Sequence, residues 1–475
     1  MADETTDVSS KLQTVLVFRY IKGSTAVERF WGFFTSAQQT ADSLSSLILN
    51  ELQPLVGQNP NKMIAQSYDG AAVMSGRHGG VQAKIKAKYP LAHFVHCYAH
   101  KLNLIMTQAA SQNSDVRIFF GNLSEIPIFF SNSSQRVHFL NKVVGRRIPR
   151  SVPTRWNFKS RTVNVVFEYR EDLIECMEEI EETSGINTTT KNQAGAIRRL
   201  LQERSFVFWL TLFHYIMPHV DILYNELQKR IIDSVEISRC LKLFKENITT
   251  IRNQKMHEIM EKAKSFENII DTKRLKFNDE TWKISATEVC DVIINVAEDR
   301  FQYTDQLNAA NLLICEKFEW YDLTFPQDYF TETMKSYPFL EKQRLKTELT
   351  VLYSSEEYRN FSSCAVLLNF LVSNNLQEVF REVIKLLKIL VTMPMTTVEA
   401  ERDFSTLNRI KTFLRSTMCQ ERLNALACLT IEQRLIRSIS DFNERVIDKF
   451  AKQKDRRIEL IFKKTRNNYI CASYY

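Results

Sequence analysis

The sequence predicts a mixed α/β segment over residues 1–160 followed by an almost wholly helical remainder. The first observation is the distribution of glycine: all eleven glycines lie at or before Gly195. Glycine permits the tight turns that connect strands and it weakens helices, so its absence favours helix. The second is hydrophobic periodicity, which changes from strands alternating with helices to a spacing of three and four residues after about Val165. The 475 residues, 44% hydrophobic and 25% charged, suffice for two or three cores.

Strands and helices alternate in the first segment. Residues 13–20 and 26–34 are predicted to be paired strands joined by a turn at Lys22–Gly23. We also expect strands at 62–68 and 93–97, and helices at 43–52, 81–89 and 98–110. This alternation indicates a partly parallel sheet.

The later sequence predicts helices within 221–243, 374–390, 396–414 and 421–435, and an exposed polar loop at 182–194. The longest apolar run, Phe206 to Met217, predicts a buried helix, because a bilayer span needs ~18 apolar residues or more. We therefore expect no membrane partner.

Charge and cysteine usage limit the class of protein. The net charge of +8 permits nucleic acid as a partner without requiring it. Nine cysteines without a CxxC pair favour reduced thiols in a cytosolic or nuclear protein. The acidic, polar N-terminus has no apolar core of a signal peptide.

Three acidic residues stand in distinctive contexts: Asp3 in ADETTDVSS, Asp69 in SYDGAAVM after a predicted strand, and Glu401 in TTVEAERDFS. Each alone fits a helix cap or a solvated surface position. Together, converging carboxylates can hold two divalent metals that activate a water or hydroxyl for phosphodiester chemistry. Such hard oxygen ligands suit Mg²⁺ or Mn²⁺.

The run HFVHCYAH offers a second set of ligand types: His93, His96, Cys97 and His100. Four zinc ligands within eight residues are hard to close tetrahedrally, and no second pair lies nearby in the sequence. We expect no zinc in this chain. A small buried thiol and a hydrogen-bonded histidine remain the structural alternative for Cys97 and His100.

Four passages, in order, resemble a transposase of the hAT superfamily, in the branch related to zinc finger MYM-type and TTF-type proteins. They are DETTD with ERFWGFF, then SYDGAAVMSGRHGGVQAKIK with HCYAHKLNL, then PTRWNFKSR, and finally PMTTVEAERDFSTLNRIKTFLRSTMCQERLNALACLTIE at 394–432. The last passage is similar to the family's dimerisation region and is the most specific.

The resemblance implies α/β plus α architecture: a ribonuclease-H-like mixed sheet interrupted by a large all-helical insertion and closed by a helical C-terminal block. The expected parts are a ribonuclease-H-like segment at 1–160, the insertion at 161–375, the dimerisation region at 376–436 and a basic helical tail at 437–475. That tail also fits nuclear import or nucleic-acid contact, although a solvated helix face is the simpler interpretation.

The resemblance also implies a DDE-type catalytic and metal-binding triad of Asp3, Asp69 and Glu401, with Mg²⁺ or Mn²⁺ as cofactor if the chain is active. Glu399 does not precede the arginine of the E-R-x-F-S element and is excluded from the triad. Cys97 and His100 match the family's C-x-x-H element, which supports the active site.

Trp156 is expected from the resemblance to stack on an unpaired base, which contributes roughly 1–3 kcal/mol. Four basic residues beside it are suited to phosphate contact: Arg146, Arg147, Arg150 and Arg155. The alternative is a core tryptophan beside solvated arginines.

The chain departs from the family at its start, because only Met1 and Ala2 precede Asp3 and no zinc finger comes before it. We expect the central strand to be incomplete, with unpaired neighbours and with Asp3 at a frayed, poorly positioned terminus. We therefore expect a nuclear, domesticated protein with dimerisation activity and DNA binding that carries out little or no transposition. The alternatives are an active transposase whose gene model is too short, and a helical scaffold without a nucleic-acid role.

Self-association through residues 376–436 is the partner prediction drawn from the C-terminal block. Consecutive predicted helices there carry apolar faces that can pack within the chain or across a dimer. These faces comprise Leu386, Leu387, Ile389, Leu390, Leu423, Leu426 and Leu429.

Overall fold

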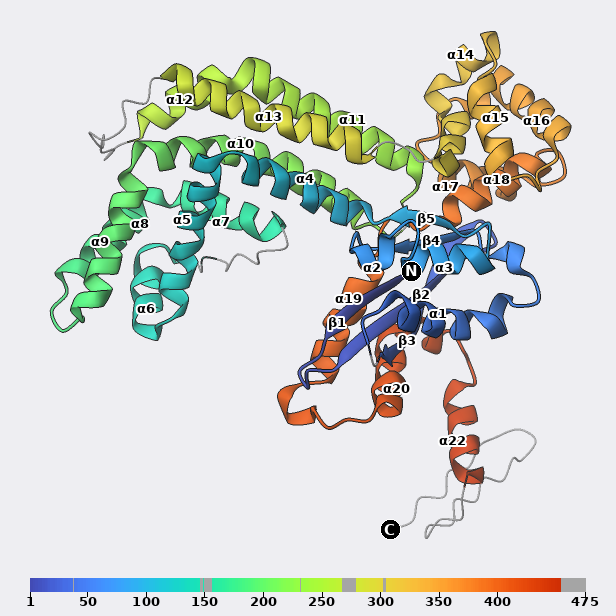
Figure 1. Cartoon of the computed structure of the whole chain (residues 1–475), viewed down its shortest axis with the longest axis horizontal. Helices are drawn as coiled ribbons and strands as arrows, with labels where there is room; N and C mark the ends of the chain where they lie inside the picture. The colour runs from blue at the N-terminus through green and yellow to red at the C-terminus, as the bar shows by residue number, and fades with distance from the viewer. Residues whose placement is uncertain are drawn as a thin grey trace.

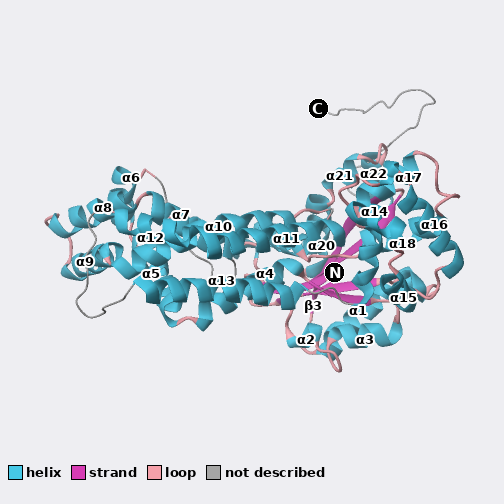
Figure 2. Cartoon of the chain, turned by 90° about the horizontal axis from the view of Figure 1, so that it is seen from above, coloured by secondary structure: helices cyan, strands magenta, loops and turns pink. Residues whose placement is uncertain are grey.

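The computed structural model describes the whole chain except residues 37, 146–147, 149–155, 231, 267–278, 302–304 and 454–475. The described part is mostly helical with two small sheets, which confirms the predicted combination of α/β and α architecture. A long helical arm extends from one side of the sheets, and a second helical group lies above them (Figure 1). Seen from above, the strands lie within one end of this elongated molecule (Figure 2).

The first sheet is antiparallel, with strand order β1-β2-β3. Its strands are β1 (Ala2–Thr6), β2 (Leu12–Lys22) and β3 (Thr25–Thr35), and the predicted β2–β3 hairpin is confirmed. Gly23 in the connecting turn has φ +67°, a conformation that glycine adopts without steric cost. The second sheet pairs β4 (Ala65–Tyr68) with β5 (His93–His96) in parallel.

The expectation that Asp3 lies at a frayed terminus is wrong. Asp3 sits inside β1 and pairs with Val15 of β2. The ladder extends to Met1, whose carbonyl accepts from Val17 N at 3.0 Å and whose ammonium donates to Val17 O at 2.9 Å. These backbone hydrogen bonds hold the strand in register, so the first acid has a defined position.

The two sheets are not joined by a ladder within the described residues, although β1 and β4 lie next to each other. A cavity of about 80 Å³ lies at this junction, lined by residues that include Met1, Leu16 and Gln66. On β4, Gln66 Oε1 and Ser67 Oγ are buried and have no hydrogen-bond partner among the residues that the structure describes. A buried unsatisfied polar atom costs about 1–3 kcal/mol, so this junction is a weak point of the sheet.

Helices cover both faces of the strands. On one side, Leu44, Ile48 and Leu52 of α1 pack in a core with Leu16 and Tyr68. This layer contains α1 (Ala41–Val56), α2 (Ala72–Ser75) and α3 (Val81–Lys88).

The other face packs against the C-terminal helices. Val15, Val17 and Phe33 form a core with Leu407 and Leu423. The covering helices are α19 (Val398–Ile410) and α20 (Gln420–Ile431). Residues from the two ends of the sequence therefore complete one unit.

The helical arm is built from α4 to α13. Its helices are α4 (Tyr98–Gln112), α5 (Ser114–Ser131), α6 (Ser134–Val143), α7 (Trp156–Glu168), α8 (Arg170–Glu182), α9 (Thr188–Gln202), α10 (Arg204–Leu227), α11 (Ser234–Thr250), α12 (Met256–Ser265) and α13 (Asp279–Phe301). The predicted buried helix at Phe206 to Met217 is confirmed as the central part of α10. By length and composition alone α10 would also be able to cross a membrane, but 67% of its most apolar window is buried within the protein.

Two predictions within the arm are wrong, and helix capping explains both. The expected loop at 182–194 is mostly helix, because the Asn187 side chain accepts from Thr190 N at 2.7 Å and starts α9. The expected helical segment at 221–243 is broken after Leu227, because Asp233 accepts from Val235 N and Glu236 N and starts α11.

The remaining helices form the second group and the C-terminal extension. They are α14 (Phe318–Leu323), α15 (Gln327–Ser336), α16 (Lys342–Ser354), α17 (Cys364–Ser373), α18 (Arg381–Thr392), α21 (Gln433–Arg437) and α22 (Phe442–Lys452). Short irregular helical segments are η1 (Pro60–Lys62), η2 (Ile251–Lys255), η3 (Asp305–Leu313), η4 (Cys315–Lys317), η5 (Glu356–Tyr358) and η6 (Phe413–Arg415). Of the predicted basic tail, only the part before residue 454 is described.

Candidate functional site

Asp3 is the most perturbed of the three predicted acids. Its carboxylate accepts from Glu4 N at 2.9 Å. Burial, with a smaller contribution from the charges of Asp69 and Glu401, raises the pKa of Asp3 to about 7 against the lowering effect of that hydrogen bond. A carboxylate on β1 therefore interacts electrostatically with two acids that are distant in the sequence.

Asp69 directly follows β4, as predicted, and its Oδ1 accepts from Ala71 N at 3.2 Å. The next residue, Gly70, runs close to two histidines of the neighbouring strand and helix. A Cβ at Gly70 would lie 2.7 Å from the His96 ring and 3.3 Å from His100 Cδ2. Glycine is thus required for this loop to bring Asp69 past the histidines.

Glu401 lies in the first turn of α19, and the segment around Cys97 fixes where that helix begins. Cys97 Sγ accepts from Thr397 N at 3.3 Å, and Tyr98 N donates to Met395 O at 3.0 Å. Burial raises the pKa of the Cys97 thiol, which therefore stays neutral. The thiol connects the end of β5 to the helix that carries the third acid.

The three acids thus come from β1, the loop after β4 and the first turn of α19. Asp3 interacts with both other acids, so residues from opposite ends of the sequence form one acidic site. Among the residues that the structure describes, however, no three His, Cys, Asp or Glu side chains are close enough together to hold a metal ion.

The histidines of the HFVHCYAH run have separate surroundings. His93 Nε2 lies 3.3 Å from Ser336 O, while the rings of His96 and His100 are 5.6 Å apart. Burial, with the charges of Lys101 and His100, lowers the pKa of His96 to about 4. His96 is therefore neutral at pH 7, and its buried Nε2 has no hydrogen-bond partner in the described part of the chain.

Trp156 corresponds to the alternative of a core tryptophan, since its side chain is buried. Its Nε1 donates to Thr107 Oγ1 at 3.1 Å, and its ring packs edge-on against Phe120 with centroids 5.0 Å apart. Lys159 Nζ lies 4.0 Å from the ring centroid. In this conformation the ring is not accessible to a base.

The four arginines predicted to contact phosphate lie outside the described residues, so their positions stay a prediction. They are Arg146, Arg147, Arg150 and Arg155.

Glu399, which the motif excludes from the predicted triad, forms two ion pairs. Its side chain is 9% exposed and binds Arg230 at 2.6 Å and Arg402 at 2.8 Å. These ion pairs connect α19 to the segment after α10 and leave Glu399 without a free face.

Sequence reasoning missed a buried ion pair between Asp7 and Lys411, whose oxygen and nitrogen lie 2.6 Å apart. Asp7 also accepts from Ser9 and from Gln13. Burial opposes ionisation of Asp7, yet Lys411 and these donors hold its pKa well below the ordinary range. The Asp-x-Ser spacing, typical of a side chain that bonds the backbone two residues on, was the available signal.

Two known protein families match this chain, each over a segment that contains one or two of the three predicted acids. Residues 1–80 match the RNase-like domain of ZMYM1/FAM200, and residues 351–435 match the hAT family C-terminal dimerisation region. Together these two matches support a hAT-family, transposase-derived protein. The dimerisation match supports self-association.

Of the two arrangements expected for the apolar faces of the C-terminal block, most positions take the first and pack within the chain. Buried side chains include all four predicted positions on α18 and Leu423 on α20. Leu426 is partly buried, while Leu429 is 49% exposed. The buried positions are therefore not on the free surface of the chain.

Proposed function

We propose that this transposase-derived protein self-associates and binds DNA, while strand cleavage at the site of Asp3, Asp69 and Glu401 is impaired. The supporting observation is that Asp3 lies on a strand of one sheet, whereas Asp69 directly follows a strand of the other. Metal catalysis needs ligands held to within about 0.5 Å of their working positions. A junction that carries a cavity and unsatisfied polar atoms provides less rigidity than a continuous ladder.

The two sheets are proposed to be halves of one ribonuclease-H-like sheet. Since β1 lies next to β4, the strands would follow the order β3-β2-β1-β4-β5. Helices on both faces of such a sheet are usual for α/β proteins. In this arrangement the all-helical insertion would separate the strands from the C-terminal block that carries Glu401.

The site's chemistry fits a divalent cation. Three carboxylates are hard oxygen donors. A bound cation would offset the free-energy cost of a negative charge on Asp3, which arises from burial and from the neighbouring carboxylates. Asp3, Asp69 and Glu401 would hold Mg²⁺ or Mn²⁺, which when bound would stabilise charge on phosphodiester oxygens. Cys97 acts only by positioning the helix of Glu401, because its thiol contacts the backbone of Thr397.

DNA binding and nuclear localisation remain proposals that draw on the net charge of +8 and on the predicted basic stretch before Trp156. Contact with phosphates releases counterions, so affinity should fall steeply with salt.

A binding and nicking experiment tests the proposal. We expect fluorescent duplex DNA to bind with an affinity that falls with salt, and supercoiled plasmid to stay intact with Mg²⁺ or Mn²⁺. The variant Arg150→Ala with Arg155→Ala should weaken binding, whereas Lys335→Ala, an exposed position on α15, serves as control. Absence of salt-sensitive DNA binding by the wild type would refute the proposal.

The second candidate is active metal-dependent strand cleavage, favoured by the interaction of Asp3 with both other acids. It predicts metal-dependent nicking by the wild type that is lost in Asp69→Asn and in Glu401→Gln. Such a result would replace impaired cleavage as the proposed function. Nicking that persists in both variants would instead point to a contaminating nuclease.

A further inference from the structure

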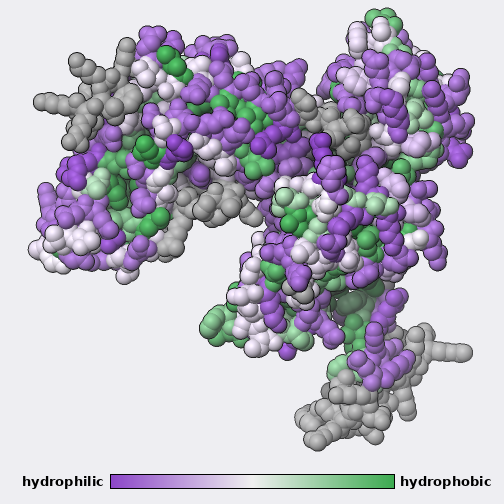
Figure 3. Space-filling model, viewed as in Figure 1, coloured by the Kyte–Doolittle hydropathy of each residue, from purple (hydrophilic) through white to green (hydrophobic). Residues whose placement is uncertain are grey.

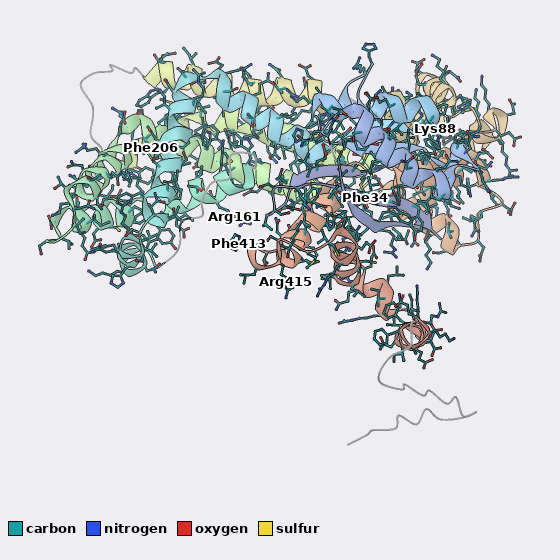
Figure 4. All side chains as sticks on the ribbon, turned by 60° about the horizontal axis from the view of Figure 1, so that its bottom comes forward. Phe34, Lys88, Arg161, Phe206, Phe413 and Arg415 are labelled. Atoms are coloured by element: carbon teal, nitrogen blue, oxygen red, sulfur yellow. The ribbon has the colours of Figure 1, made fainter. Side chains whose placement is uncertain are left out.

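Two neighbouring apolar side chains project from the short turn η6, between α19 and α20. Phe413 is 84% exposed and Leu414 is 92% exposed. Both lie within residues 351–435, the match to the hAT dimerisation region. Figure 3 shows hydrophobic surface on this loop, and Figure 4 places Phe413 and Arg415 at the outer end of the C-terminal helices.

The turn is anchored on both sides, so its exposed tip has a fixed position. Before it, Lys411 is buried and bound to Asp7 at 2.6 Å. After it, Met418 packs into the core beneath the sheet, and Gln420 Nε2 donates to Phe33 O at 2.7 Å. Within the turn, Arg415 N donates to Thr412 O at 2.8 Å. A partner would therefore meet preorganised side chains, which lowers the entropy cost of association.

Other exposed apolar residues lack this combination. Leu323 on α14 is 82% exposed, but it stands outside the matched region. On α22, Val446 and Phe450 are about half exposed, and this helix also follows the matched region. The predicted leucines of α18 are already used inside the protein.

We propose that Phe413 and Leu414 form the central contact through which a second copy of this chain binds. The inference rests on the self-association part of the proposed function and names the surface that performs it. Aromatic and aliphatic side chains presented together are typical centres of protein interfaces. Arg415 beside them supplies a polar edge that keeps the free protein soluble.

Sedimentation velocity of the full chain over a wide concentration range tests this surface. We expect wild-type protein to shift from monomer to dimer with concentration. The variant Phe413→Ser with Leu414→Ser should raise the dimer dissociation constant roughly hundredfold. Leu323→Ser is the control, because it removes a similarly exposed apolar side chain at another place on the surface. It should leave the dimer dissociation constant unchanged. Melting curves identical to wild type would exclude misfolding, since both sites are on the surface.

The outcomes separate this inference from the proposed function. Dimerisation that persists in the double variant overturns the inference but leaves self-association intact. If Val446→Asp with Phe450→Asp dissociates the dimer and the η6 variant does not, α22 is the interface and the inference is again wrong. A wild-type protein that stays monomeric at every concentration would refute self-association itself.

Discussion

At the scale of single residues, Asp3 should make stability depend on pH. Its pKa rises from 3.8 to about 7 on folding, mainly through burial. Between these pH values the folded protein binds a proton that the unfolded chain has lost, so the free energy of unfolding falls as pH rises and levels off above pH 7. We expect Asp3→Asn to raise the melting temperature at pH 8 and to have little effect near pH 4. Asp328→Asn, on the exposed side of α15, should be neutral at both.

The same residue should link metal binding to pH, because a cation competes with the proton on Asp3. Mg²⁺ should raise the melting temperature of the wild type more at pH 8 than at pH 5.5, and Asp3→Asn or Asp69→Asn should remove this shift. An equal Mg²⁺ effect in all three proteins would show that the cation binds elsewhere.

Gly70 is a second position where one atom decides the geometry. In Gly70→Ala the new Cβ would meet the His96 ring at 2.7 Å, closer than carbon atoms tolerate. Overpacking of this kind costs about 1–3 kcal/mol, and urea unfolding measures it. Gly79→Ala is the matched control, since no atom lies within 4 Å of its Cβ. Adding His96→Ala should recover most of the loss; if it does not, the clash with His96 is not the cause.

At the scale of elements, the ion pair between Asp7 and Lys411 connects the β1–β2 turn to the C-terminal end of α19. Both side chains are almost fully buried, at 1% and 2% exposure. Lys411→Met leaves the Asp7 charge buried without its partner, which costs about 3–5 kcal/mol. Lys335→Met breaks an exposed pair with Glu332 and should cost less than about 1 kcal/mol. Equal losses in the two variants, measured by urea unfolding, would contradict the buried-pair argument.

Elements were predictable from sequence where local signals decide them. The β2–β3 hairpin follows from two strand-like segments joined by a glycine-containing turn. The buried helix within α10 follows from a long apolar run. The start of α9 was missed because Asn187 lies in a polar stretch that is also typical of a turn. The start of α11 was missed because the helical spacing of apolar residues continues across Asp233. Strand β1 was missed because its sequence is polar and carries no strand pattern. Backbone pairing with β2 makes it a strand nevertheless.

For the candidate site, the sequence proposed a set of residues but not their geometry. Motif order identified Asp3, Asp69 and Glu401, and the structure brings them into electrostatic contact. Nothing in the sequence revealed that Cys97 would bond the backbone at the start of α19, or that Trp156 would be enclosed by Phe120 and Thr107. Those relations depend on how distant helices dock.

At the scale of the whole molecule, the sheet depends on helices from the other end of the chain. Val15, Val17 and Phe33 are fully buried, and they pack against Leu407 and Leu423. Burying each such side chain contributes about 1.5–3 kcal/mol, a large share of the stability of a typical domain. A chain ending at residue 350 should therefore lose the protected amides of β2 in hydrogen exchange, although all strands are present. A chain ending at residue 440 should keep them, because none of the described residues beyond that point is buried. Retained protection in the shorter chain would mean that the N-terminal segment folds without its C-terminal cover.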